Sequence, residues 1–350
     1  MFTGIDLYSD TMTRPTPAMK QAMMAAEVGD EQKDEDPTTL RLEARVAEIT
    51  GLGAAMFFPT ATLCNQVALK LLSKPGDELL AWEHCHLFFA EAGGPAIHSS
   101  LMARPIRSPD GVFTGRDVAS TFRGATGPHY PVSRVLSVEN TTNMGGGVAW
   151  PLDALDSVVE TGRALGLKLH LDGSRLFNAA ISSAVPPLRL TRGFDTVTLC
   201  FSKGLGCAAG AALAFAPEAR AEVRRLKQLM GGALRQSGIL AAGALYALDR
   251  HVERLQEDHD NARRLALGLV ERVPWARVES PSPSTNMVFF EWSHPRLPAA
   301  DLGKRLADRG LRFSRVGEHR FRAVTHLDVT AGDVDRASAI LEETGRSADV

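Results

Sequence analysis

The sequence predicts an α/β protein with a large domain, built on a mostly parallel sheet flanked by helices, and a smaller α+β domain towards the C-terminus. Short apolar runs alternate with helical stretches as far as about residue 215, which is typical of parallel strands joined by helical crossovers. With 350 residues, the chain is long enough to bury two hydrophobic cores. Beyond residue 215 the pattern changes first to helices and then to a short mixed region.

Six apolar runs are the expected strands of the large domain. They lie at residues 54–58, 78–82, 135–138, 167–171, 196–201 and 211–215. Helices are expected before and between them, at residues 18–26, 40–50 and 152–165, where the sequence is rich in helix-forming residues. Two further helices are expected after the strands, at residues 239–252 and 255–273.

We place the domain boundary so that residues 1–272 form the large domain, with an N-terminal arm, and residues 273–350 form the small one. The small domain is expected to contain two strands and two helices. The strands are predicted at 286–292 and 321–325, and the helices at 299–309 and after Thr330, which is a candidate N-cap.

Composition excludes several classes of partner. The formal net charge is −2 and no block of Lys and Arg stands out, so we expect no nucleic-acid partner. No run approaches the roughly eighteen apolar residues that a membrane helix needs, so we expect no membrane partner. The four cysteines have no metal-type spacing and are too few for a disulfide framework, which indicates a reducing, cytoplasmic setting.

Two polar residues that each follow an apolar run carry the strongest chemical signal. Lys203 lies in Ser202-Lys203-Gly204, and Asp172 opens Asp172-Gly173-Ser174-Arg175. A lysine that forms a Schiff base with pyridoxal phosphate, and an acid on a neighbouring strand that pairs with the pyridinium nitrogen, are expected in this arrangement. Each motif alone is more often a surface turn. Together they predict a pyridoxal phosphate enzyme.

Other motifs each leave a functional and a structural interpretation open. The turn at Ala61-Thr62 enters a helix whose N-terminus suits a phosphate. His84 and His86, if they lie on a strand, share a face and suit a metal, but no third ligand accompanies them, so we predict no metal and expect one imidazole to stack on the cofactor. Arg235 and Arg322 are anion-binding candidates or solvated surface residues.

The motifs together resemble the low-specificity L-threonine aldolases, which are pyridoxal phosphate enzymes of the aspartate-aminotransferase fold (fold type I) and of the β-eliminating lyase superfamily. The likeness covers nearly the whole chain. It is carried by Ser9-Asp10-Thr11-Met12-Thr13-Arg14-Pro15, Asp36-Pro37-Thr38, Glu91-Ala92-Gly93-Gly94, Glu139-Asn140-Thr141, Asp172-Gly173-Ser174-Arg175, Ser202-Lys203-Gly204-Leu205-Gly206, Arg235-Gln236-Ser237-Gly238 and Val324-Thr325-His326.

The resemblance implies a role for each candidate residue. Lys203 would form the Schiff base, Asp172 would pair with the pyridinium nitrogen, and His86 would stack on the ring and act in catalysis. The residues implied for the cofactor phosphate are Ala61, Thr62, Ser202 and, from a neighbouring subunit, Arg235, and those implied for the substrate carboxylate are Ser9, Arg175 and Arg322. Arg175 also counts among the cofactor-binding residues. A homodimer or homotetramer with shared active sites is therefore expected.

This chain departs from the family pattern around the expected substrate. Thr142 stands where the family usually has His, and Lys33 and Tyr8 replace the family's Tyr and Arg. We include Thr142 and Lys33 among the substrate-binding candidates. The predicted function is cleavage of a β-hydroxy-α-amino acid, of the threonine, allo-threonine or phenylserine type, to glycine and an aldehyde. The alternatives are a racemase, aminotransferase or β-eliminating lyase with the same cofactor, and a non-catalytic binding protein of the same fold.

Overall fold

The computed structural model describes residues 2–124 and 127–349. Its large domain is built on a seven-stranded sheet of order β2-β8-β7-β6-β5-β3-β4. The strands are β2 (Ala54–Phe58), β3 (Glu78–Trp82), β4 (Met102–Ile106), β5 (Ser133–Glu139), β6 (Lys168–Gly173), β7 (Thr196–Cys200) and β8 (Ala211–Phe215). Adjacent strands from β4 to β7 run parallel, whereas β8 is antiparallel to both β7 and β2.

The six strands predicted for the large domain are confirmed, and β4 is the strand of this seven-stranded sheet that the sequence did not reveal. β4 reads Met-Ala-Arg-Pro-Ile, and four of its five residues are exposed or only partly buried. It lies at the edge of the sheet. Proline is tolerated on an edge strand because its missing N–H faces away from the ladder. The buried strands β3, β7 and β8 show the opposite pattern, since every residue in them is buried.

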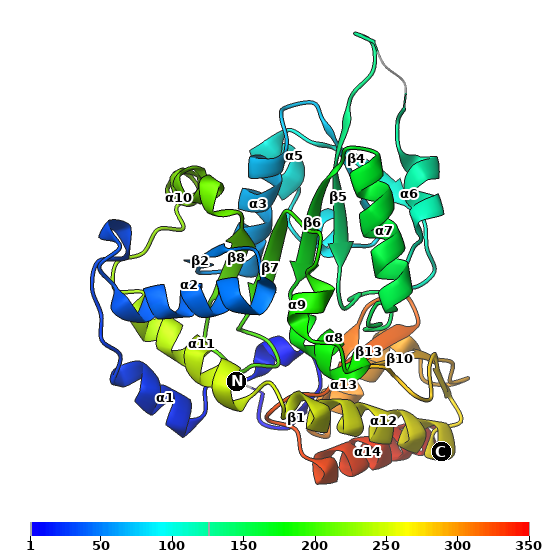
Figure 1. Ribbon diagram of the computed structural model, residues 1–350. Coiled ribbons are helices and arrows are strands. Elements are labelled where there is room, and N and C mark those ends of the chain that lie inside the picture. The colour runs from blue at the N-terminus through cyan, green and yellow to red at the C-terminus, as the bar shows by residue number, and fades with distance from the viewer. Residues whose placement is uncertain (1, 125–126, 350) are drawn as a thin grey trace.

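Helices cover both faces of this sheet (Figure 1). α3 (Ala61–Leu72) and α10 (Arg220–Leu229) pack together on one face, where they form a core with β2 and β8. On the other face lie α2 (Pro37–Thr50), α7 (Leu152–Ala164) and α11 (Gly238–Arg250). The remaining helices of this domain are α1 (Pro17–Met24), α4 (His86–Phe89), α5 (Gly94–Ser99), α6 (Gly115–Thr121), α8 (Leu176–Ser183) and α9 (Pro187–Leu190). The predicted fold class is confirmed.

Local chemistry explains where α2 begins and ends. Asp36 caps its N-terminus by accepting the backbone N–H of Thr39 at 2.9 Å, and Pro37 occupies the first helical position, where no N–H is needed. Gly51 ends the helix at φ 71°, in the left-handed region that favours glycine. Between these ends, Leu42 and Val46 are four residues apart and fully buried against the sheet.

The C-terminal part of the chain forms a second unit with its own sheet. This sheet has the order β12-β13-β10-β9 and is antiparallel throughout. Its strands are β9 (Ala276–Val278), β10 (Met287–Trp292), β12 (Ser314–Arg315) and β13 (Arg320–Val324), and its helices are α12 (Leu255–Arg272), α13 (Ala299–Asp308) and α14 (Ala331–Asp349). Its core includes Ala262, Leu265 and Leu269 of α12, which precede the predicted boundary at residue 273.

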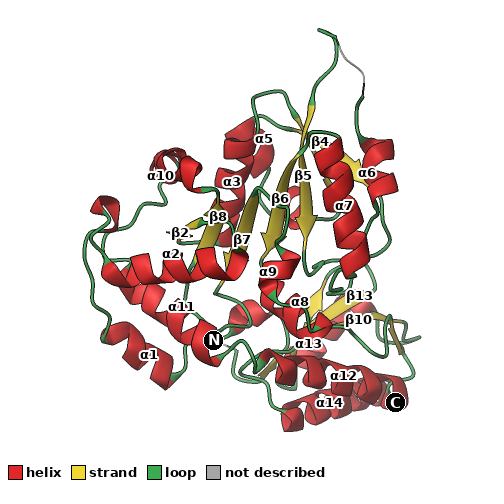
Figure 2. Ribbon diagram, in the orientation of Figure 1, coloured by secondary structure: helices red, strands yellow, loops and turns green. Residues whose placement is uncertain are grey.

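The N-terminal arm also belongs spatially to the small domain. β1 (Ile5–Asp6) pairs in parallel with β11 (Leu311–Arg312), and Leu7 is buried in the core of the small domain. The strands β5 and β6 point their carboxyl ends towards that domain (Figures 1 and 2). Polar residues at the carboxyl ends of β5, β6 and β7 therefore lie where the arm, the sheet and the small domain meet.

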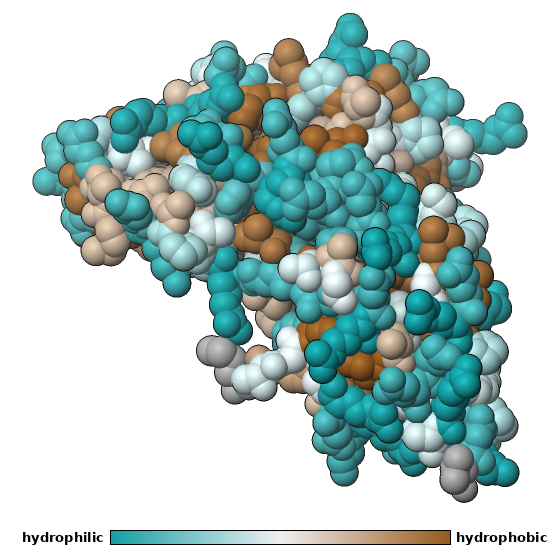
Figure 3. All heavy atoms as spheres, turned by 90° about the horizontal axis from the view of Figure 1, so that it is seen from below, coloured by the Kyte–Doolittle hydropathy of each residue, from teal (hydrophilic) through white to brown (hydrophobic). Residues whose placement is uncertain are grey.

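Hydrophilic residues predominate on the face of the molecule that Figure 3 shows, and hydrophobic residues lie there in small separate groups. No helix in the described ranges is both long enough and apolar enough to cross a membrane.

Candidate active site

Asp172 is a buried carboxylate at the carboxyl end of β6. Its Oδ2 accepts the side-chain amide of Asn65 at 2.9 Å, and its Oδ1 accepts the backbone N–H of Ser174 at 3.1 Å. Burial alone raises the pKa of this carboxyl, but the nearby positive charges of His86 and Lys203 outweigh burial and lower it. Asp172 is therefore an anion. Among the described residues, the donors that bind it directly are the neutral amide groups of Asn65 and Ser174.

Lys203 follows β7 and lines a cavity of about 430 Å³ between the two domains. Its backbone carbonyl accepts the hydroxyl of Thr13 at 2.8 Å, which ties the lysine turn to the N-terminal arm. Within the described ranges, no carboxylate forms an ion pair with its ammonium group. A free primary amine and a buried anion on neighbouring strands are the two groups that pyridoxal phosphate needs, one for its aldehyde carbon and one for its ring nitrogen. The residues present fit that cofactor.

His86 lies at the start of α4, after β3 has ended at Trp82, so His84 and His86 do not lie on a strand and the condition for a shared strand face is not met. His84 is exposed, whereas the His86 ring contacts Glu91, with Nδ1 2.8 Å from Oε1. Burial lowers the pKa of His86, but the hydrogen bond that its ring donates to Glu91 and the charges of Asp172 and Glu91 raise it above the usual value.

A buried polar network joins His86 to Asp172. Glu91 accepts the side-chain amides of Asn65, at 2.8 Å, and Gln66. Because the Asn65 amide also donates to Asp172, one side chain of α3 links the carboxylate beside His86 to the carboxylate at the end of β6. In the described residues, the ligand atoms of His86, Glu91 and Asp172 are the one trio of metal-ligand type within 4.8 Å of one another.

Arg175, which lines the cavity, forms a bidentate ion pair with Asp10. The guanidinium Nε and Nη2 of Arg175 lie 2.7 Å from the two carboxylate oxygens of Asp10. Both side chains are buried. Burial raises the pKa of Asp10, but the charge and hydrogen bonds of Arg175 lower it by more, so this pKa lies well below its ordinary value. This pair fixes the arm carrying Ser9, whose side chain also lines the cavity, against the end of β6.

Arg322 extends from β13 of the small domain into the same cavity. Its Nη1 donates to the side-chain oxygen of Asn143 at 2.6 Å, while its buried Nε has no partner among the described residues. Burial and the neighbouring Arg175 lower the pKa of Arg322 to about 10. A guanidinium with an unused buried donor is suited to a carboxylate.

The sequence matches the family model of the beta-eliminating lyases over residues 6–293. The chain belongs to the beta-eliminating lyase family. The low specificity L-threonine aldolase of Escherichia coli (strain K12) is 38% identical to it over 336 residues, which cover 96% of this chain and 97% of the relative.

Solved structures show the same fold at low identity. The threonine aldolase of Leishmania major is 19% identical, with a TM-score of 0.81 over 97% of this chain and 99% of that one. A structure of SPT with PLP is 18% identical, with a TM-score of 0.75 over 99% of this chain and 88% of that one.

The other predicted site residues of this lyase-family chain lie outside the cavity wall. Ala61 and Thr62 are the first two residues of α3, and Asn65, one turn further along this helix, donates a hydrogen bond to Asp172. Ser202 precedes Lys203 in the chain. Thr142 is fully buried, and its hydroxyl accepts the backbone N–H of Val148 at 3.2 Å. Lys33 and Arg235 lie apart from the cavity.

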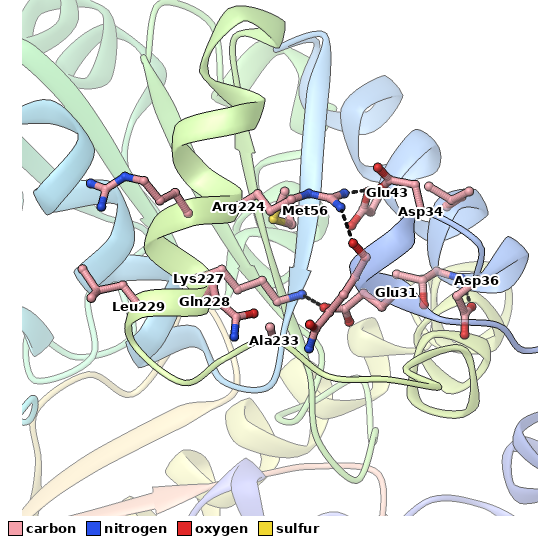
Figure 4. A pocket seen from close by; sticks show the side chains of 14 residues that line it. Glu31, Asp34, Asp36, Glu43, Met56, Arg224, Lys227, Gln228, Leu229 and Ala233 are labelled. Atoms are coloured by element: carbon pink, nitrogen blue, oxygen red, sulfur yellow. Dashed lines mark hydrogen bonds and ion pairs between the residues drawn. The ribbon is translucent and has the colours of Figure 1, made fainter.

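A second cavity of about 440 Å³ lies beside Lys33 and Arg235, between α2, α10 and the segment before α2 (Figure 4). Its buried lysine, Lys227, forms an ion pair with Glu31, and Arg224 forms one with Asp34. Because Lys227 is paired with an acid of the same chain, the lysine that lines this cavity is not free in the way that Lys203 is.

Sequence reasoning missed the residues that support the site from behind. Asn65, Gln66, Glu91 and Asn143 were not among the candidates, although Glu91 and Asn143 lie in or directly beside quoted motifs. The spacing of five residues between His86 and Glu91 carries no signal by itself, because the contact depends on the turn between α4 and α5.

Proposed function

We propose that this protein is a pyridoxal phosphate-dependent aldolase that cleaves a β-hydroxy-α-amino acid of the threonine type, reversibly, into glycine and an aldehyde. The observation that carries the proposal is that Lys203, His86 and Arg322 line one cavity, while the charges of His86 and Lys203 act on the buried carboxylate of Asp172. Support comes from a full-length relative, 38% identical, that is named a low specificity L-threonine aldolase.

The cofactor's place follows from the groups that would hold it. Lys203 would hold its aldehyde carbon, Asp172 its ring nitrogen, and His86 one face of its ring. Ala61 and Thr62, at the N-terminus of α3, together with Ser202 would hold its phosphate, because free N–H groups at a helix N-terminus attract anions. Bound pyridoxal phosphate would supply an electron sink for the electron pair left on Cα when the Cα–Cβ bond breaks.

The remaining chemistry belongs to residues of this chain. Arg322, Arg175 and Ser9 would bind the substrate carboxylate, with the Arg175 guanidinium held in place by Asp10. This fixes the orientation of Cα and directs the β-hydroxyl towards the His86 ring. The Nδ1–H of His86 donates a hydrogen bond to Glu91, which leaves Nε2 to accept the proton of the β-hydroxyl as the Cα–Cβ bond breaks.

Arg235 and Lys33 fit a role in a neighbouring copy of the chain. Arg235 is 62% exposed, and its Nη1 forms an ion pair with Asp30 at 3.0 Å. We propose a homodimer or homotetramer in which Arg235 reaches the phosphate, and Lys33 the substrate, of an adjacent subunit. We also place the protein in the cytoplasm, since its four cysteines are buried free thiols, as a reducing compartment favours.

The experiment is to incubate the purified protein and pyridoxal phosphate with L-threonine, L-allo-threonine and phenylserine, and to measure glycine and aldehyde. Equal amounts of both products are expected, together with a cofactor absorbance band that Lys203→Ala loses. Lys70→Ala, on the partly buried flank of α3, is the matched control and retains both. Release of a keto acid, or an inverted amino acid without aldehyde, would overturn the aldolase assignment.

A further inference from the structure

Glu139 is a buried carboxylate that the proposed reaction does not use. It ends β5 directly beside Asp172, which is its register partner on β6. It is 8% exposed and does not line the cavity. Its Oε2 accepts the backbone N–H of His86 at 2.7 Å, and its Oε1 accepts the backbone N–H of Asn143 at 2.6 Å. In the part of the chain that the structure describes, no Lys or Arg forms an ion pair with it.

These two bonds belong to a longer chain of hydrogen bonds along the cavity wall. The side-chain oxygen of Asn143 accepts Nη1 of Arg322 at 2.6 Å. Glu139 thus connects α4, which carries His86, to the loop after β5, and that loop connects to β13 of the small domain. Three members of the chain, His86, Asn143 and Arg322, line the cavity. The indole N–H of Trp150 donates to the backbone carbonyl of Glu139 at 2.9 Å and anchors the strand end itself.

A carboxylate is the side chain that this position requires. Two backbone N–H groups approach it, one at each oxygen, and an ionised carboxylate presents only acceptors. A glutamine of the same shape would turn an NH2 group towards one of the two N–H donors. Holding an anion here is costly, because burial and the neighbouring Asp172 both disfavour its charge. Two charge-assisted hydrogen bonds offset part of that cost.

We infer that Glu139 is a positioning residue that sets the separation between His86 and Arg322. It thereby holds the proton-accepting imidazole at the right distance from the hydroxyl of a substrate whose carboxylate is bound by Arg322. This inference rests on the proposed function, because the aldolase reaction is what requires both groups to engage one substrate at once. Asp172 and Lys203 do not belong to the chain, so cofactor binding is expected to survive its loss.

The test compares Glu139→Gln with Glu43→Gln. Glu43 is also a buried glutamate that accepts a backbone N–H, that of Phe57 at 3.0 Å, but it lies outside the active-site cavity. With saturating pyridoxal phosphate, Glu139→Gln is expected to keep the cofactor absorbance band, to lower kcat roughly 100-fold through misplacement of His86, and to raise KM about tenfold through loss of one positioning bond. Glu43→Gln is expected to change thermal stability while leaving kcat and KM unchanged.

A second variant separates the two halves of the chain. Asn143→Ala breaks the link to Arg322 and leaves Glu139 bound to His86. It is expected to raise KM, and the dissociation constant of glycine measured by equilibrium dialysis, with kcat within about twofold of wild type. If Glu139→Gln does not fold, the test of the inference rests on Asn143→Ala alone. An unchanged affinity of Asn143→Ala for glycine then overturns the inference.

The outcomes distinguish this inference from the proposed function. A wild-type protein that releases no aldehyde refutes the aldolase proposal, whereas weaker glycine binding by Glu139→Gln and Asn143→Ala would still support the link to Arg322. An active wild type with unchanged kcat and KM in Glu139→Gln overturns the inference. A loss of thermal stability without a change in kcat or KM does the same, because it would show a purely structural carboxylate.

Discussion

Nδ1 of His86 lies 2.8 Å from Oε1 of Glu91, and the Glu91 side chain is completely buried. Since an ionised carboxylate only accepts hydrogen bonds, the ring donates through Nδ1 and keeps Nε2 as its basic atom. Asn65 and Gln66 hold the carboxylate in place. The tautomer of His86 is therefore set by a residue five positions further along the chain.

Glu91→Gln is expected to lower the pKa of His86 and to shift the acid limb of the kcat–pH profile to lower pH. Burial lowers this pKa, and the Glu91 hydrogen bond and charge are among the groups that raise it, so removing the charge leaves burial less opposed. The neutral imidazole is the active form, and it would then persist to lower pH. His84→Gln, two residues away and exposed, is the control, with an unchanged profile. An acid limb at the wild-type pH in Glu91→Gln would contradict the assignment.

Asp10→Asn is expected to destabilise the protein strongly, because it leaves Arg175 as a buried cation without its partner. Breaking a buried ion pair in this way costs about 3–5 kcal/mol. The pKa of Asp10 is held below its ordinary value, so the ionised carboxylate contributes stability at neutral pH that is lost only as pH falls through the lowered pKa. Chemical denaturation should show that the free energy of unfolding differs between wild type and variant by a constant amount near neutral pH, and that this difference shrinks in strong acid. Asp156→Asn, which removes a partly exposed partner of Arg189, should cost much less.

Arg322→Lys is expected to raise KM for the amino acid about tenfold or more, with a smaller change in kcat. A lysine presents a point charge, whereas the guanidinium binds Asn143 through Nη1 and keeps Nε for the carboxylate. Steady-state kinetics with L-threonine would measure both constants. Arg320→Lys, two residues along the same strand and paired with Glu279, is the control. Equal KM values in the two variants would show that Arg322 does not bind the substrate carboxylate.

Acidification is expected to destabilise the fold through His170. Burial lowers the pKa of this histidine to about 4. Its ring lies between the hydroxyl of Thr196, at 2.9 Å, and the side-chain oxygen of Asn65, at 3.1 Å. The unfolded chain takes up a proton near the ordinary histidine pKa of about 6.5, while the folded chain does not until about pH 4, so stability falls across that window. The loss is on the order of 3 kcal/mol. His170→Gln should flatten this dependence in denaturation curves. An equally steep loss of stability in the variant would assign the effect to other groups.

The sequence located most strands and helices because burial leaves a compositional trace. The runs that became β3 and β8 are apolar at nearly every position, and β7 combines apolar residues with two threonines, as the burial of every residue in these strands favours. β4 left no such trace because it is an exposed edge strand that contains an arginine and a proline. The predicted domain boundary at residue 273 followed the end of the helix expected at residues 255–273, whereas packing joins α12 and the N-terminal arm to the small domain.

By itself the sequence indicated the cofactor chemistry, because Asp172 lies at the carboxyl end of one recognisable strand, Lys203 follows the next one, and their side chains have few other uses together. What surrounds them was decided by the tertiary structure. Glu91, Asn65 and Glu139 act through contacts between segments far apart in the chain, and their residue types occur elsewhere with no such role. A strand is encoded locally by hydrophobicity, whereas a hydrogen bond between distant segments exists only once the chain has packed. That is why the support of His86 and Arg322 became visible in the folded molecule.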